Sequence, residues 1–147
     1  MSASIPVIAI PHGAYWCTPF ARWQGSLAHL HSLRFAARVA RDALAARAIE
    51  LNAFDYGVLG MTLPQRKSFY GLPWLTSEIG AAHIVDHTIM QACATSARVL
   101  VQAAQEVASG AADCALTITA DRVSNGPHLY YPNPQGAGGS GESEDWV

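Results

Sequence analysis

The stretch from Thr88 to Arg122 constrains the fold more than any other part of the chain, because its periodicity changes three times. A short strand-type run, Thr88 to Met90, leads past Cys93 into a segment with helical spacing. Gly110 is typical of a helix C-terminus, and a strand-type run from Cys114 to Ala120 follows. The pattern predicts strand, cysteine elbow, helix and strand. One apolar face of the helix is expected to comprise Ala97, Leu100, Val101, Ala104, Val107 and Ala108.

Cys93 stands at or beside the first turn of this predicted helix. Unpaired backbone N–H groups and the positive end of the helix dipole favour a thiolate there and bind oxyanions. Cys93 is therefore a candidate nucleophile. A free cysteine is also often a small buried hydrophobe, so its position alone leaves a structural role open.

The rest of the chain alternates between strand and helix patterns. Apolar runs predict strands at 6–10 and 55–61, and helical spacing predicts an Ala-rich helix at 33–48 with its arginines on a solvated face. A short helix at 76–83, capped by Thr76, is also expected. The order βαβαβαβ indicates a layered α/β fold with a mainly parallel central sheet. Ligands of such sheets bind beyond the carboxyl ends of the strands, which is where Cys93 falls.

Composition fits one domain with a real core. Of the 147 residues, 50% are hydrophobic and 14% charged, which excludes a disordered chain. A net charge of −2 gives no electrostatic footprint for nucleic acid or an anionic membrane. The mean hydropathy of +0.14 points to surface covered by another domain or subunit, or to the abundance of alanine. No apolar run is long enough to span a membrane.

Cysteine and histidine usage argues against a metal site and for a cytoplasmic protein. Cys17, Cys93 and Cys114 form neither a metal-type pair nor an even disulfide framework, and they suit a reducing compartment. The first residues lack the basic and apolar regions of a signal peptide. His83 and His87 have the spacing of a helical ligand pair, but no third ligand stands nearby, so we expect them to be structural or exposed.

The residues resemble the N-terminal half of the thiolase family, which comprises acetyl-CoA acetyltransferases and 3-ketoacyl-CoA thiolases. The strongest element is QACATSARVLVQAAQEVASGAADCALTITADRVS, which looks like the thiolase cysteine elbow, helix, Gly-x-x-Asp turn and strand. RWQGSL (22–27), VLG (58–60) and DRVSNGPHLYYP (121–132) are similar in kind to other family segments. The resemblance implies a thiolase-like half-domain at 1–122, with helices on both faces of its sheet. Residues 123–147 would begin a loop or insertion region.

The chain departs from the family pattern in its elbow and in its length. Ser96 replaces the usual glycine three residues after the cysteine, and Met90 replaces the asparagine three residues before it, which suggests a divergent branch with a differently shaped pocket. The family's second half supplies a Gly-His-Pro or Asn-x-His-Pro histidine and a Cys-x-Gly cysteine. Neither motif occurs here, and Gly126-Pro127-His128 has its proline and histidine reversed.

The resemblance implies acyl transfer through an acyl-enzyme on Cys93, whose own backbone N–H would help to hold the oxyanion. Coenzyme A and acyl-CoA would be substrates, with no covalently bound cofactor and no assigned residues for the coenzyme. No residue of the chain can be assigned as the base, so we expect the chain to be an incomplete N-terminal part that is inactive alone. Its expected partners are further copies of itself, in a homo-oligomer, or a complementary C-terminal thiolase half. The alternatives are a non-catalytic thiolase-like subunit and a small cysteine hydrolase that uses His12 or His128 as its base.

Overall fold

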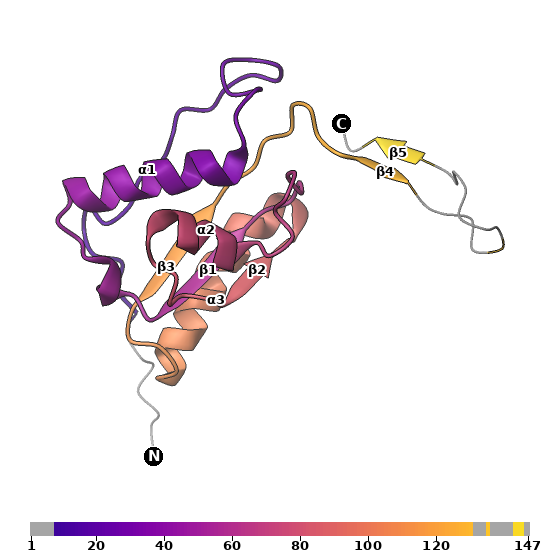
Figure 1. The fold of residues 1–147 in the computed structure, drawn as a ribbon. Helices are drawn as coiled ribbons and strands as arrows, with labels where there is room; N and C mark the ends of the chain where they lie inside the picture. The colour runs from indigo at the N-terminus through magenta and orange to yellow at the C-terminus, as the bar shows by residue number, and fades with distance from the viewer. Residues whose placement is uncertain (1–7, 131–134, 136–142, 146–147) are drawn as a thin grey trace.

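The computed structural model describes residues 8–130, 135 and 143–145. Its central feature is a parallel three-stranded sheet with the strand order β2-β1-β3. A separate antiparallel pair, β4-β5, lies apart from it (Figure 1). The elements in chain order are α1 (Ser32–Ala46), η1 (Leu51–Ala53), β1 (Tyr56–Gly60), α2 (Leu72–Ile79), β2 (His87–Ile89), η2 (Ala92–Ala94), α3 (Thr95–Ser109), β3 (Ala115–Thr119), β4 (His128–Tyr130) and β5 (Ser143–Asp145).

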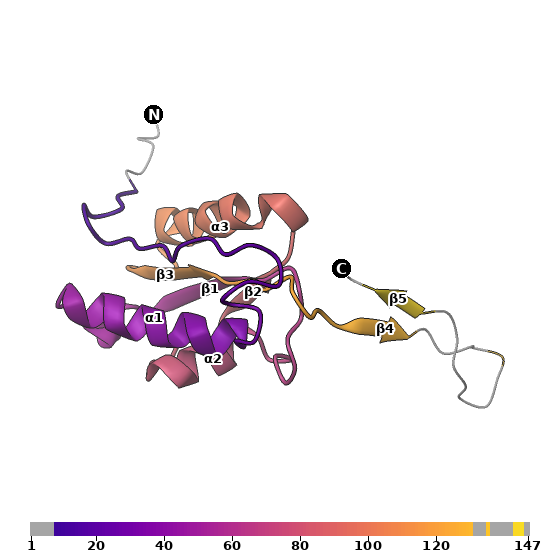
Figure 2. The same ribbon diagram turned by 90° about the horizontal axis from the view of Figure 1, so that it is seen from above.

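Helices cover both faces of the sheet, as expected. Figure 2 shows α3 on one face and α1 with α2 on the other. Strand β1 runs through the middle and is buried along its whole length, and its side chains alternate between the two layers. Leu59 belongs to the larger core beneath α1 and α2, whereas Val58 belongs to a smaller core beneath α3.

Two elements differ from the sequence-based expectation near the N-terminus and at α2. Ile8 to Ile10 lie in no strand, and Ile10 is 66% exposed, so the predicted strand at 6–10 is wrong for these residues; Pro6 and Val7 lie outside the described part. The short helix begins at Leu72 rather than Thr76, because Pro73 occupies its first turn, where the missing N–H costs nothing. Thr76 is no cap: it is fully buried in mid-helix, and its hydroxyl donates to the carbonyl oxygen of Ile84 at 2.7 Å.

Helix α3 meets the sheet mainly through a different face from the one expected, although Val107 of the expected face packs against the smaller core. Thr95, Val99 and Ala103, spaced by four residues, are its buried residues. Leu100 and Val101, which the sequence placed on the apolar face, are 49% and 46% exposed. The helix nevertheless ends as predicted, with Gly110 in the left-handed conformation at φ 77°.

The segment before α1 is tied to the body by specific hydrogen bonds. Arg47, which the sequence placed on a solvated face, donates to the carbonyl oxygens of Gly13, Ala43 and Tyr15. Gln24 N–H donates to Ser124 Oγ at 2.7 Å. The N-terminal segment therefore contacts the residues that follow β3. Within the described ranges, no helix has the length and apolar character that crossing a membrane requires.

Candidate active site

Cys93 lies in a tight elbow between β2 and α3. The turn passes through Ala92, whose φ of 46° is a left-handed conformation that non-glycine residues rarely adopt. The side chain of Thr95 holds this turn: its hydroxyl accepts from Gln91 N–H at 2.8 Å and donates to the Ala92 carbonyl at 2.7 Å. Because Thr95 is only 5% exposed, these two bonds are shielded from water and fix the backbone on both sides of the nucleophile candidate.

Gly60, the last residue of β1, lets the start of α3 approach the sheet closely. A Cβ atom at this position would lie 2.8 Å from Thr119 Cγ2 and 2.9 Å from the Cγ2 atoms of Thr95 and Val99. No side chain therefore fits at Gly60 without movement of its neighbours. Thr95, which holds the turn, also packs on this glycine. The elbow and the contact between α3 and the sheet therefore depend on the same residue.

The Cys93 side chain is exposed and stands directly before α3. Ala94, the N-cap residue, provides no side-chain hydrogen bond to the first turn of that helix. The N–H group of Thr95, the first residue of the helix, donates to the carbonyl oxygen of Ala92, and the positive end of the helix dipole favours an anion beside Cys93. The site lies at the carboxyl ends of the parallel strands, since the elbow directly follows β2. This is the sheet edge that the sequence predicts.

The other two cysteines occupy different environments. Cys17 is exposed, and its Sγ donates to the carbonyl oxygen of the next residue, Thr18. Cys114 is half-buried against the larger core, and this burial, with a smaller contribution from the charge of Asp55, raises the pKa of its thiol. Of the three, only Cys93 combines exposure with a helix N-terminus, so it is the candidate nucleophile on structural grounds as well.

No base contacts Cys93 in the part of the chain that the structure describes. His83 bonds to the carbonyl oxygen of Phe54 at 3.0 Å, and His87 bonds to the hydroxyl of Tyr56 at 2.9 Å. Both histidines therefore have structural partners, and no cluster of three metal-binding side chains occurs among the described residues. His12 is exposed, and the side chain of His128 lies outside the described part.

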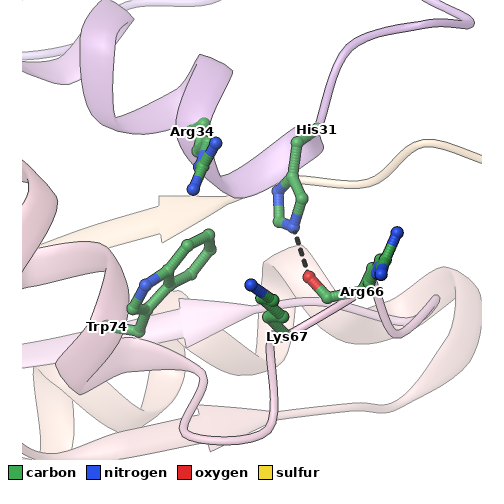
Figure 3. Close-up of a pocket in the computed structure, with 5 residues that line it drawn as sticks. All are labelled: His31, Arg34, Arg66, Lys67 and Trp74. Atoms are coloured by element: carbon green, nitrogen blue, oxygen red, sulfur yellow. Dashed lines mark hydrogen bonds between the residues drawn. The ribbon is translucent and has the colours of Figure 1, made fainter.

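A second polar feature, which the sequence reasoning missed, lies at the start of α1. A pocket of about 290 Å³ is lined by His31, Arg34, Arg66, Lys67 and Trp74 (Figure 3). The available signal was the adjacent pair Arg66 and Lys67 in the loop after β1, but nothing in the sequence indicates that α1 brings Arg34 to the same place.

Comparisons with known proteins agree with this architecture. The family model described as "Thiolase, N-terminal domain" matches residues 14–143. The acetyl-CoA acetyltransferase of Bacillus anthracis has a similar fold, with a TM-score of 0.68 and 17% identity over 85% of this chain and 32% of that one. Human mitochondrial 3-ketoacyl-CoA thiolase superposes with a TM-score of 0.58 and 22% identity over 65% of this chain and 25% of that one. The same human enzyme in complex with CoA gives a TM-score of 0.57 and 23% identity over the same shares.

The chain spans about a third or less of the length of these solved structures. No curated protein matches it significantly. The family model nevertheless covers most of the chain, and the parallel sheet with helices on both faces is the fold of the structural neighbours. The chain belongs to the thiolase family, whose N-terminal domain it matches.

Proposed function

We propose that Cys93 is the acyl-accepting nucleophile of a thiolase-type acyltransferase and that this chain supplies the N-terminal part of the active site. The Cys93 thiolate attacks the acyl carbonyl carbon of an acyl-CoA thioester. The carbon–sulfur bond to coenzyme A breaks, the coenzyme leaves as a thiolate that takes up a proton, and the acyl group stays on Cys93. A carbanion then removes the acyl group in condensation, or the thiol of coenzyme A removes it in thiolysis.

The observation that carries this proposal is the elbow itself. An exposed thiol stands where the positive end of a helix dipole favours negative charge, in a turn fixed by a buried threonine. The tetrahedral oxyanion formed on acyl transfer requires donors that are already in place, and the proposed donor is the Cys93 backbone N–H at this turn. The fold shared with an acetyl-CoA acetyltransferase supports the same reaction class.

The surface beside Cys93 supports the need for a complementary half. Cys93 and Ala97 are four residues apart, and Leu100 and Val101 follow at helical spacing, so all four share one stripe. Each of the four is exposed. Apolar surface beside a nucleophile that lacks a base fits a site completed by another polypeptide segment, which would cover the stripe and supply the base and acid.

Acyl transfer to a defined cysteine tests the proposal. The chain, alone and mixed with the C-terminal half of a thiolase, is incubated with acetyl-CoA, and its peptides are mapped by mass spectrometry. We expect an acetyl group on Cys93 in the mixture, retained in Cys17→Ala and lost in Cys93→Ala. Acetylation that survives Cys93→Ala would show that another residue is the acceptor.

The non-catalytic alternative has one observation in its favour: among the described residues, no base contacts Cys93, and His83 and His87 are bonded elsewhere. It predicts that the chain binds a thiolase partner but never carries an acyl group. Complex formation with no acetylation of Cys93 in either sample would favour this alternative over catalysis.

A further inference from the structure

We propose that the pocket formed by the start of α1, the loop after β1 and the first part of α2 binds a phosphate-bearing ligand. Arg34 comes from α1 and His31 is the residue directly before this helix, Arg66 and Lys67 come from the loop, and Trp74 comes from α2. Figure 3 shows Arg34 above the Trp74 indole and Lys67 below His31. Arg66 lies on the side of the His31 ring opposite to Trp74. Two segments that are distant in the sequence, α1 and the loop after β1, thus bring three cations to one pocket, and α2 adds an aromatic ring.

The charge in this pocket is not neutralised by the described residues. No carboxylate lines it. Within the described part of the chain, the side chains of Arg34, Arg66 and Lys67 make no hydrogen bond or ion pair. Arg34 instead lies over Trp74, with its guanidinium carbon 5.8 Å from the ring centroid. Like charges held near one another repel, and a multivalent anion such as phosphate relieves that repulsion while accepting from several donors at once.

The start of α1, which borders this pocket, also has features that favour an anion. His31 Nε2 donates to the carbonyl oxygen of Arg66 at 2.8 Å, which joins the start of α1 to the loop. Ser32, the first residue of α1, is 6% exposed, and its Oγ has no partner in the described structure. No side chain caps the helix, and the positive end of its dipole favours an anion there.

The loop that carries Arg66 and Lys67 is held in place before any ligand arrives. The carboxylate of Asp121 accepts from the N–H groups of Thr62 and Leu63, each at 2.9 Å, and from the Thr62 hydroxyl at 2.6 Å. Lys67 adopts a φ of 64°, an uncommon conformation for a residue with a side chain. A preformed loop loses little conformational entropy on binding, which favours affinity for a small ligand.

The size of the pocket limits the ligand. A volume of about 290 Å³ lies at the lower end of the range for small-molecule sites, so it fits a phosphate group and a small adjoining part. The exposed part of the Trp74 ring offers such a part a flat apolar surface. Free phosphate and the phosphorylated end of a nucleotide share this chemistry, and the inference does not depend on acyl transfer at Cys93.

Calorimetric titration of the full chain distinguishes these sources, with inorganic phosphate, AMP and uncharged adenosine as probes. We expect phosphate and AMP to bind and adenosine not to bind. Arg34→Gln with Lys67→Gln should weaken both anions by at least about tenfold. The matched control, Arg38→Gln with Arg98→Gln, removes the same charge from residues outside the pocket and should bind nearly as the wild type does.

Trp74→Leu identifies the ligand class. Loss of an AMP preference over phosphate in this variant would assign a nucleotide, whereas equal affinity for both probes in the wild type would assign phosphate alone. The proposal is wrong if the wild type binds neither anion, or if the pocket variant and the control variant lose affinity equally. Circular dichroism verifies that each variant is folded. If the double pocket variant does not fold, the single variant Lys67→Gln, at an exposed loop position, is used in its place.

Discussion

Replacing Gly60 with alanine should both destabilise the protein and disturb the cysteine elbow. The new Cβ atom would lie 2.8–2.9 Å from three methyl groups, where ordinary contacts begin at 3.4 Å, so each pair is about 0.5 Å too close. These methyl groups belong to Thr95, Val99 and Thr119, and two of them are on α3. Overpacking of this kind costs about 1–3 kcal/mol, which lowers the melting temperature by roughly 3–10 °C in a chain of this size.

Gly57→Ala provides a matched control on the same strand. Its Cβ atom would lie 2.5 Å from Ile84 Cγ2 and 3.1 Å from a methyl group of Leu72, so it overpacks the opposite face of β1. We expect a comparable loss of stability, because the added volume is the same and the crowding is similar. The two variants differ in which layer moves: α3 and the elbow for Gly60→Ala, and α2 for Gly57→Ala.

The assay measures unfolding in urea together with the alkylation rate of Cys93 by iodoacetamide, read from the mapped peptide so that Cys17 and Cys114 serve as internal references. Gly60→Ala should change the Cys93 rate relative to Cys17, whereas Gly57→Ala should leave this ratio at its wild-type value. A Gly60→Ala protein with unchanged stability and an unchanged Cys93 rate would refute the view that close helix approach at Gly60 positions the nucleophile.

Substitutions at three further positions test contacts in the elbow, at the amino ends of β1 and β3, and in the loop after β1. Thr95→Val removes the hydroxyl that bridges the elbow and should cost about 1–3 kcal/mol in urea unfolding, whereas Thr95→Ser, which keeps the hydroxyl, should cost less. The N–H groups of Asp113 and Cys114 lower the pKa of the Asp55 carboxyl. The ionised Asp55 carboxylate therefore stabilises the fold above its usual pKa, near 3.8, and this stabilisation is lost as the pH falls through the lowered pKa. Asp55→Asn should flatten the acid limb of the stability–pH curve. An unchanged limb would contradict this. Asp121→Ala should release the loop after β1 and weaken phosphate binding in calorimetry, and unaltered binding would show that the loop needs no such anchor.

Local signals account for what the sequence predicts correctly. Strands β1 and β3 are short apolar runs with clear ends, and Gly110 ends α3 in the conformation for which glycine is preferred. The position of Cys93 between a strand and a helix follows from the change of period at that point. These features depend on residues close in sequence, so no tertiary information is needed.

The errors arise where tertiary contacts override a local pattern. The stripe Thr95, Val99, Ala103 has perfect helical spacing, but its first member counts as polar when only hydrophobicity is scored. Thr95 is buried because its hydroxyl is satisfied by the elbow and its methyl packs over Gly60. The basic pocket could not be predicted for a related reason: the distance between α1 and the loop after β1 is set by the whole sheet.

The choice of the buried stripe also determines what surrounds the nucleophile. Because Gly60 admits α3 only through Thr95 and Val99, the opposite stripe, with Leu100 and Val101, is turned away from the sheet. Cys93 lies at the start of that outward stripe, because it precedes Leu100 and Val101 at helical spacing. A segment that buried these apolar side chains would also exclude water from the thiol, where electrostatic effects on an oxyanion are strongest. Covering α3 and completing the proposed active site would then be one event, so we expect Cys93 acylation and protection of α3 from hydrogen exchange to appear together in the presence of a C-terminal thiolase half.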